Sequence, residues 1–418
     1  MKAVLGLVFA LLAFDASAQS HGHHAADTNL QQIAELTGSA PGQWFGAGVA
    51  VSGNTLVVGA PRVSEGCNGQ LDCGAAYVYT ASNGDWSTLT QVATLTQTDG
   101  GTYFQFGDSV AISGNTIVVS GVDPTTNLAA VYVFVEPQGG WEDATQTAEL
   151  TVPALLELGT FLRVAIDGDT VVAGVPFAES FQGGIEGGDA YVFVRPEGGW
   201  VNMSPRAQLV ATRGKQDFEF GFAVSVSGPA IIVGAPNATF DGASREGLAY
   251  LFLKPPGGWS GTVPQTTEFE ASDGAKDWTF GISVSISGNA AVIGAPEARP
   301  AAAYIYTKPA GGWPKNMTES ARLAPGKGAS GRFFGYTVAL SGNTAVIAAT
   351  YTGDLQGTAY VFSLQDDSER GEIFASDGAA GDFFGCSLAI GDGVIVVGAD
   401  GYSNESTPGA AYVFGELE

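Results

Sequence analysis

The sequence predicts an all-β fold: a seven-bladed β-propeller of four-stranded antiparallel blades, closed by the N-terminal strand. Three observations lead to this fold class. A unit of 50 to 61 residues recurs seven times along the 418 residues, each unit contains four strand-like segments, and no helical periodicity is present after residue 18. The 60 glycines lie mostly in the turns of this unit.

The first strand of each unit follows a Phe-Gly dipeptide and alternates apolar with polar residues. It ends in a tight turn, usually Gly-Asn as at 53–54, because both residues tolerate positive φ. The dipeptides are Phe45-Gly46, Phe106-Gly107, Phe220-Gly221, Phe280-Gly281, Phe334-Gly335 and Phe384-Gly385, with Phe161-Leu162 as a degenerate seventh copy.

The second strand is a continuous β-branched run such as TLVVGAP (55–61), which indicates burial on both faces. A loop of variable length leads to a third strand such as AAYVY (75–79), and a second hairpin leads to an outer strand such as QVATL (91–95). That hairpin usually contains Gly-Gly-Trp. Its tryptophans are Trp141, Trp200, Trp259 and Trp313, with Trp86 in a similar turn.

The two ends of the pattern predict how the ring closes. The chain starts its pattern with QQIAEL (31–36), which matches an outer strand, and ends it with AAYVF (410–414), which matches a third strand. The last blade therefore lacks an outer strand of its own, and we expect residues 31–36 to supply it.

Segments such as VAVSGNTLVVGAP (49–61) resemble FG-GAP repeats, the unit of the integrin α-subunit propeller, over residues 30–418. The resemblance implies that Phe-Gly and Gly-Ala-Pro are packing and turn signatures. Several integrin repeats carry an acidic calcium loop between the first two strands, whereas this chain has two-residue turns such as Gly53-Asn54 there. Such turns supply too few oxygens for calcium, so we expect no integrin-type calcium site and no cofactor.

Residues 1–18 have the pattern of a secretory signal peptide: Lys2, an apolar run from Ala3 to Phe14, and a small-residue cleavage site at Ala16-Ser17-Ala18. We expect residues 19–29 to form a flexible tail that contains histidine and residues 30–418 to form the propeller. No apolar run is long enough to cross a bilayer. The predicted location is outside the cell or at its surface, or the periplasm in a bacterium.

Cysteines and histidines are few. Cys67 and Cys73 flank a short Gly-containing loop and are predicted to form a disulfide, and Cys386 is predicted to be a small buried core residue. All three histidines lie at positions 21, 23 and 24, which excludes histidine-based catalysis from the propeller body. After cleavage, His21 would be the third residue and could help an N-terminal amine bind copper or nickel; the alternative is a solvated tail.

The formal net charge of −25 argues against nucleic acid and anionic membranes as partners. We expect a monomer whose partner is an extracellular protein or glycan.

We number the strands of a blade 1 to 4 from the inside outwards. In a propeller the 2–3 loops and 4–1 connections lie on one face, and here the 2–3 loops differ most between repeats, so this face is the candidate binding face. Each candidate could instead be a loop-packing or solvated residue. The candidates for ligand binding are Phe177, Phe181, Phe240, Asp241, Arg245, Tyr351, Asp354, Tyr402 and Asn404, with Asp123 as a further hydrogen-bonding residue.

Two repeated features have both a functional and a structural interpretation. The Gly-Gly-Trp hairpins could stack on sugars, but their recurrence with the blade favours a structural role in which each indole covers the end of its own blade. The acid pairs Asp273/Asp277 and Asp377/Asp382 could suggest glycosidase carboxylates, but their recurrence favours turn chemistry.

The leading functional hypothesis is a secreted or cell-surface, non-catalytic binding or adhesion propeller. One alternative is a polysaccharide lyase or hydrolase that uses carboxylate, Tyr and Arg side chains in the propeller funnel. The second alternative is a structural protein of an envelope or matrix.

Overall fold

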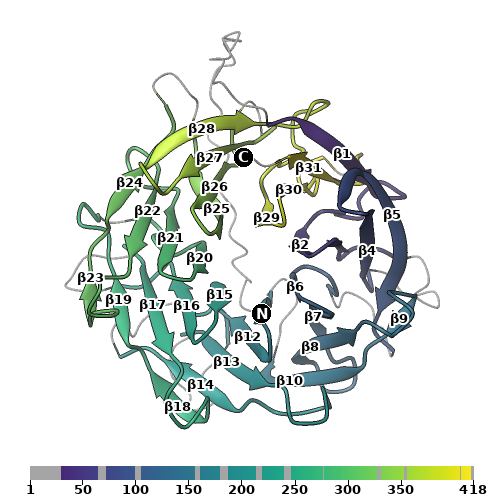
Figure 1. Cartoon of the computed structure of the whole chain (residues 1–418), viewed down its shortest axis with the longest axis horizontal. Coiled ribbons are helices and arrows are strands. Elements are labelled where there is room, and N and C mark those ends of the chain that lie inside the picture. Colours follow the sequence, from purple (N-terminus) through teal and green to yellow (C-terminus); the bar gives the residue numbers. More distant parts are fainter. Residues whose placement is uncertain are drawn as a thin grey trace, which may run out of the picture.

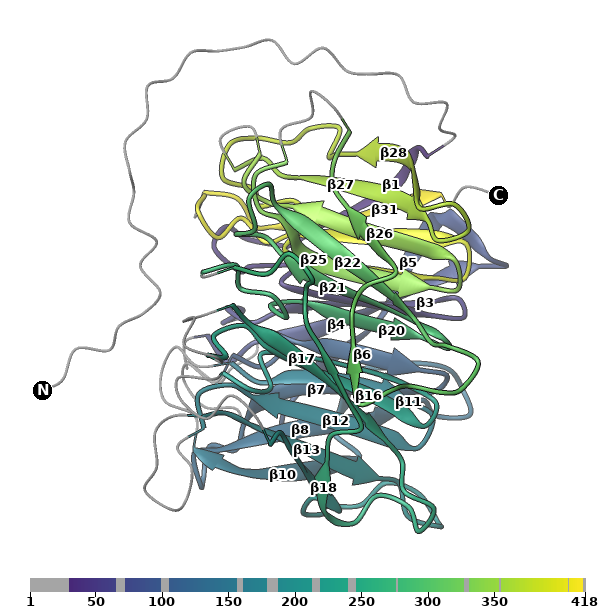
Figure 2. The same cartoon turned by 90° about the vertical axis from the view of Figure 1, so that its left-hand side faces the viewer.

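The computed structural model shows a ring of seven β-sheets around a central axis (Figure 1). Seen from the side, the ring is a disc whose strands run between its two faces (Figure 2). The structure describes residues 30–64, 72–98, 105–155, 161–178, 187–212, 219–239, 246–275, 277–326, 331–352, 355–404 and 406–415. In these ranges every regular element is a strand, and no helix of the length and hydrophobicity of a membrane span is present.

Each sheet is one blade, and its strands follow the chain from the centre to the rim. Blade 1 contains β2 (Gly48–Ser52), β3 (Thr55–Ala60), β4 (Ala75–Ser82) and β5 (Asp85–Thr96). Blade 2 contains β6 (Val110–Ser113), β7 (Thr116–Val122), β8 (Leu128–Val135) and β10 (Ala148–Leu155). Blade 3 contains β11 (Arg163–Asp167), β12 (Thr170–Val175), β13 (Asp189–Val194) and β14 (Ala207–Val210).

The next three blades repeat this order. Blade 4 contains β15 (Ala223–Ser227), β16 (Ala230–Ala235), β17 (Leu248–Leu253) and β19 (Thr267–Phe269). Blade 5 contains β20 (Val284–Ser287), β21 (Ala290–Ala295), β22 (Ala302–Thr307) and β24 (Ala321–Leu323). Blade 6 contains β25 (Phe334–Ser341), β26 (Thr344–Ala349), β27 (Thr358–Ser363) and β28 (Ser368–Ile373).

Blade 7 joins the two ends of the chain. It contains β29 (Ser387–Gly391), β30 (Val394–Ala399) and β31 (Ala410–Gly415), and its outer strand is β1 (Gln32–Thr37). β1 pairs antiparallel with β31, with Ala34 opposite Val413 and Leu36 opposite Ala411. β1 therefore occupies the position that the sequence predicted for residues 31–36, the outer strand of the last blade.

Three blades have a fifth strand that the sequence did not predict. The segments that follow Gly-Gly-Trp form β9 (Ala144–Thr145), β18 (Gly261–Pro264) and β23 (Asn316–Met317), and each pairs in parallel with the outer strand of the preceding blade. The prediction of four strands per blade was therefore incomplete for blades 1, 3 and 4. The extra strands cover an outer edge that would otherwise expose unpaired backbone groups.

The tryptophans of these hairpins lie between blades. The side chains of Trp141, Trp200, Trp259 and Trp313 are only 3–8% exposed and pack in cores shared by their own blade and the preceding one. The prediction that each indole covers the end of its own blade was thus wrong in detail, because the indole also packs against the preceding blade. Buried indole faces are not available to stack on a sugar.

Phe-Gly and Gly-Ala-Pro meet at the contacts between blades. A Cβ at Gly59 would collide with the carbonyl oxygen of Gly107 in the next blade, and Gly234 has the same relation to Gly281. Across the closing junction, a Cβ at Gly398 would collide with the carbonyl oxygen of Gly46. Glycine is required here because two backbones touch.

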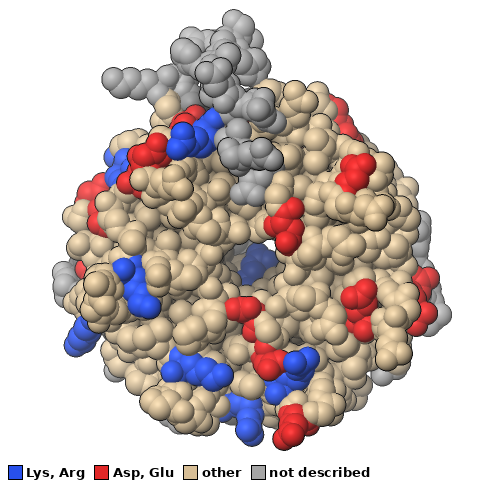
Figure 3. All heavy atoms as spheres, in the orientation of Figure 1, with Lys and Arg blue, Asp and Glu red and all other residues tan. Residues whose placement is uncertain are grey.

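A ring of hydrogen bonds joins the inner strands at their 1–2 turns. The last residue of one inner strand accepts a bond from the turn amide of the next blade, as in Gly114 N to Ser52 Oγ (3.2 Å) and Gly228 N to Asp167 Oδ2 (2.6 Å). The inner strands β15 and β29 are partly exposed along their whole length because they face the centre of the ring. A hollow lies at this centre, with acidic side chains near its rim (Figure 3).

Candidate functional site

The structure describes four of the nine predicted ligand-binding residues: Phe177, Tyr351, Tyr402 and Asn404. Outside the described residues lie Phe181, Phe240, Asp241, Arg245 and Asp354, together with the signal peptide, His21 and Cys67. Cys73 is buried, and its pairing with Cys67 stays a prediction. Cys386, predicted to be a small buried core residue, is half-buried, because it directly precedes the innermost strand of blade 7.

The residue before each Phe-Gly dipeptide has a left-handed backbone, with φ between 48° and 61°. This conformation lets the chain reverse from the 4–1 connection into the inner strand, while the phenylalanine itself is buried. The side chain of the residue before Phe-Gly consequently lies at the start of the inner strand, on the face of the 2–3 loops. The residues at this position are Trp44, Gln105, Glu219, Thr279, Phe333 and Phe383.

Three of these residues are aromatic, and they join aromatic residues of nearby segments in one continuous group. Tyr336 lies at the start of β25, Tyr351 follows β26, and Tyr402 follows β30, so all three lie toward the same face. We call the group the aromatic arc; it consists of Trp44, Phe333, Tyr336, Tyr351, Phe383 and Tyr402.

The rings of the aromatic arc contact one another in sequence. Their centroids are separated by 5.1 Å (Trp44–Tyr402), 6.0 Å (Tyr402–Phe383), 5.1 Å (Phe383–Tyr351), 4.4 Å (Tyr351–Phe333) and 6.1 Å (Tyr351–Tyr336). Successive ring planes are inclined by 33–71°, which is typical of tilted and edge-to-face contacts. Tyr402, which lies between Trp44 and Phe383, is 57% exposed, so the arc is open to solvent at this ring.

The arc belongs to blades 6, 7 and 1, whereas blades 2, 4 and 5 have Gln105, Glu219 and Thr279 at the position before Phe-Gly. A smaller aromatic group lies in blades 3 and 4. There Phe161 contacts Phe177 at 5.3 Å and Phe222 at 5.2 Å, and the Arg163 guanidinium lies 4.4 Å from the centre of the Phe161 ring.

Asp400 is the acidic residue next to the arc. It follows β30 at the third position of Gly-Ala-Pro, where Pro61, Pro236 and Pro296 stand in other blades. Its Oδ1 accepts a hydrogen bond from the backbone N–H of Tyr402 at 3.0 Å. Burial raises the pKa of Asp400 to about 7, and the charge of Asp108 contributes to the increase.

Charged and polar groups from opposite sides of the ring influence one another. Arg163 of blade 3 pairs with Asp108 of blade 2 at 2.7 Å. The pKa of Tyr336 in blade 6 is raised mainly by burial, and it responds to the charges of both Arg163 and Asp400. The pKa of the Cys386 thiol is likewise raised, by burial and then by Asp400. All of these groups lie at or near the start of an innermost strand, except Asp400, which directly follows β30, so they surround the central axis on the face of the 2–3 loops. We call this place the mouth of the central channel.

We call the aromatic arc together with Asp400 the channel-mouth cluster. It presents aromatic faces, tyrosine hydroxyls and one carboxyl group, which is the composition of a binding site for a small group or chain end. The sequence analysis identified Tyr351 and Tyr402 but missed Trp44, Phe333, Tyr336, Phe383 and Asp400. A position-by-position comparison of the repeats at the residue before Phe-Gly would have found three of them.

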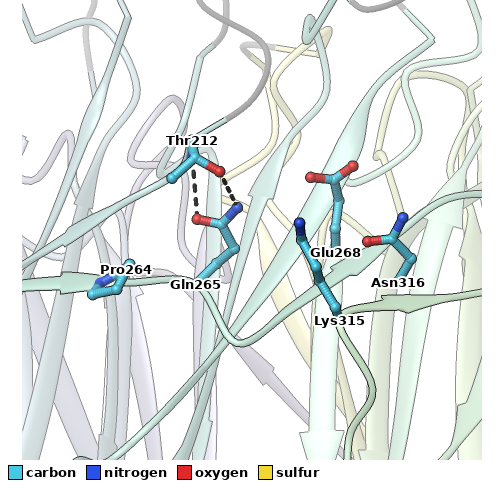
Figure 4. Close-up of a pocket in the computed structure, with 6 residues that line it drawn as sticks. All are labelled: Thr212, Pro264, Gln265, Glu268, Lys315 and Asn316. Carbon is cyan, nitrogen blue, oxygen red and sulfur yellow. Dashed lines mark hydrogen bonds between the residues drawn. The ribbon is translucent and has the colours of Figure 1, made fainter.

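A second hollow, a pocket of about 470 Å³, lies on the outer rim (Figure 4). Two of its polar residues bond to each other: Thr212 N donates to Gln265 Oε1 at 3.1 Å, and Gln265 Nε2 donates to Thr212 Oγ1 at 2.7 Å. The lining residues are Thr212, Pro264, Gln265, Glu268, Lys315 and Asn316.

The pair in this pocket belongs to a repeated clamp between blades. A Gln or Glu just before or at the start of one outer strand accepts a hydrogen bond from the backbone N–H that follows the outer strand of the preceding blade. The clamp pairs are Gln146–Thr98, Gln265–Thr212, Glu319–Ser272, Glu369–Gly326 and Gln32–Ser376, at 2.9–3.1 Å. A feature present at five junctions is structural, so the rim pocket is not the candidate site.

The acid pairs of the sequence analysis are also structural where their bonds are described. Asp273 and Asp377 accept hydrogen bonds from the hydroxyls of Tyr304 and Tyr412 at 2.8 and 2.9 Å. The described residues contain no group of three or more His, Cys, Asp or Glu side chains that could hold a metal ion. The expectation that calcium sites are absent stays a prediction.

Comparison with known families identifies the repeat. The FG-GAP repeat model matches six segments: residues 31–79, 89–134, 203–252, 263–306, 317–362 and 368–414. The unmatched interval contains Phe161-Leu162, the degenerate copy. A search of curated proteins gave no match.

Proposed function

The chain belongs to the FG-GAP repeat family, and we propose that it is an exported, non-catalytic binding propeller whose extracellular ligand, a glycan or a protein, occupies the channel-mouth cluster. A propeller scaffold of this family supports a binding or adhesion role. The signal-peptide pattern of residues 1–18 supports export.

One observation supports the location of the site: several departures from the repeat occur together. Aromatic residues before Phe-Gly (Trp44, Phe333 and Phe383) and an acid in place of proline (Asp400) lie in adjacent blades and on one face. Packing of the fold requires none of these departures, because the other blades do without them. Concentrated departures on a repeated scaffold are typical of a binding site.

The partly buried carboxyl of Asp400 gives further support. A pKa of about 7 means that keeping this group ionised costs stability, which the prolines of other blades avoid. Groups that cost stability are frequently retained for function.

The enzyme alternative has one observation in its favour, since Arg163, Tyr336 and Asp400 face the same mouth. A lyase of this kind would need Tyr336 as a base. The raised pKa of Tyr336 keeps its hydroxyl protonated at neutral pH, which opposes that role.

The test is to probe an array of glycans and extracellular proteins with the purified mature protein, and to incubate it with a polysaccharide panel. We expect saturable retention that Tyr402→Ala weakens, without new reducing ends or unsaturated uronates. Turnover that requires Asp400 would establish the enzyme alternative. Absence of both retention and turnover would refute the binding proposal and leave the structural role.

A further inference from the structure

Resting on the proposed function, we propose that the ligand of the channel-mouth cluster is an uncharged glycan, with one sugar ring stacked on the aromatic arc and its hydroxyls bonded to Asp400. The aromatic arc is the apolar part of this site. Its ring planes are inclined to one another, so together they form a curved wall rather than a flat platform.

A curved wall of ring faces suits the C–H surface of a pyranose ring. The exposed side chain of Tyr402 is the open part of the wall, and it contacts Trp44 on one side and Phe383, only 7% exposed, on the other. Aromatic rings bury large apolar areas with little loss of side-chain entropy. The wall therefore supplies binding energy without needing charge on the ligand.

Asp400 supplies the polar part of the site. The backbone N–H of Tyr402 is its partner at Oδ1, and no ion pair between Asp400 and a cation is found among the described residues. Sugar hydroxyls are donors that a partly desolvated carboxylate can accept. The hydrogen bond that the backbone N–H of Tyr402 donates to Asp400 fixes the Tyr402 backbone relative to the carboxyl group.

Charge selects against acidic glycans. Asp400 and Asp108 both lie at the mouth, and Arg163 is already paired with Asp108 at 2.7 Å. The Arg62 guanidinium, 4.7 Å from the centre of the Trp44 ring, is likewise paired, with Asp72 at 3.4 Å. The whole chain carries a formal charge of −25. Uronic acid, sulfate and sialic acid groups would be repelled by the acids at the mouth and, during their approach, by the net negative charge of the protein.

The test measures binding of neutral hexose oligosaccharides (glucan, galactan and mannan series) to the mature protein by saturation-transfer NMR and titration calorimetry. Uronate, sulfated and amino-sugar series are measured in parallel. The variants are Tyr402→Ala and Tyr402→Phe. The control is Phe374→Ala, which removes an aromatic side chain that is 46% exposed just after β28.

We expect a neutral series to bind, with an affinity about tenfold lower for Tyr402→Ala, as loss of one stacked ring predicts. Affinity should change less than about twofold for Tyr402→Phe and Phe374→Ala. Thermal unfolding of each variant shows whether it is folded.

The possible failures are distinguishable. Binding of an acidic or amino-sugar series or a protein instead of any neutral series, weakened by Tyr402→Ala, would overturn the inference and keep the proposed function. Binding that Tyr402→Ala leaves unchanged would overturn both. No binding of any probe would also overturn both.

Discussion

Blades 2 to 5 and the group of blades 6, 7 and 1 share one scaffold but differ at the mouth of the channel. Both regions have the glycine contacts between blades, as Gly234 and Gly398 show, and both have the clamp, as Gln265 and Gln32 show. Only the second region has the aromatic arc and Asp400. The glycine contacts and the clamp are thus what the repeat needs in order to fold, whereas the aromatic arc and Asp400 are additions to one part of the ring.

The largest expected effect tests whether packing is equivalent in the two regions. Gly234→Ala and Gly398→Ala each place a Cβ against a backbone carbonyl of the next blade, so each should lower the free energy of unfolding by about 3 kcal/mol or more. Chemical denaturation measures the change. Gly257→Ala is the control, because a Cβ there meets nothing within 4 Å. A large loss for Gly234→Ala alone would show that the closing junction packs differently.

The second effect concerns Asp400, which exists only in the second region. Its folded pKa of about 7 lies above the ordinary value of 3.8, so the folded state retains a proton that the unfolded state releases between those pH values. Stability should therefore fall as pH rises through this window. Asp400→Asn should remove the loss and raise the free energy of unfolding by about 2–4 kcal/mol at pH 8, with little change at pH 4.

Denaturation of Asp400→Asn and the parent across pH 4 to 8 measures this difference. Glu142→Gln is the control, because Glu142 is an exposed acid in a hairpin of blade 2, far along the chain from the channel-mouth cluster. An Asp400→Asn variant that is equally or less stable at pH 8 would refute the cost assigned to the buried carboxyl.

A smaller effect tests the clamp in both regions. Gln265→Ala and Gln32→Ala each remove a side-chain acceptor from a backbone amide at a blade junction, and each should cost about 1–2 kcal/mol of unfolding free energy. Gln91→Ala is the control, since Gln91 is at the corresponding position of blade 1 and its bonds described here stay within that blade. Equal losses for Gln91 and the two clamp residues would contradict the clamp.

Sequence reasoning predicted the scaffold well because each blade is a local pattern. Phe-Gly, the Gly-Asn turns and the β-branched runs specify strands within about sixty residues, and the order of the terminal segments places β1 on blade 7. The parallel strands β9, β18 and β23 were missed because they join neighbouring blades through short segments without a strand pattern.

The candidate site was predicted only in part, for a related reason. Tyr351 and Tyr402 lie in loops that differ from repeat to repeat, and such loops can be recognised from the sequence alone. Trp44 and Phe383 directly precede the Phe-Gly dipeptide, so in the sequence they cannot be told apart from the repeat itself. Only the structure, with their left-handed backbone, shows that their side chains lie at the mouth. The proximity of Arg163 and Tyr336 depends on closure of the whole ring and has no local signal.

Hydrogen–deuterium exchange with and without a ligand that the array identifies tests the location of the site most directly. We expect protection in residues 42–47, 333–337, 351–352, 382–386 and 400–404, which carry the channel-mouth cluster. We expect none in the 1–2 turns or around the rim pocket at Thr212 and Gln265. Protection confined to either of those places would show that the ligand does not bind at the mouth formed by blades 6, 7 and 1.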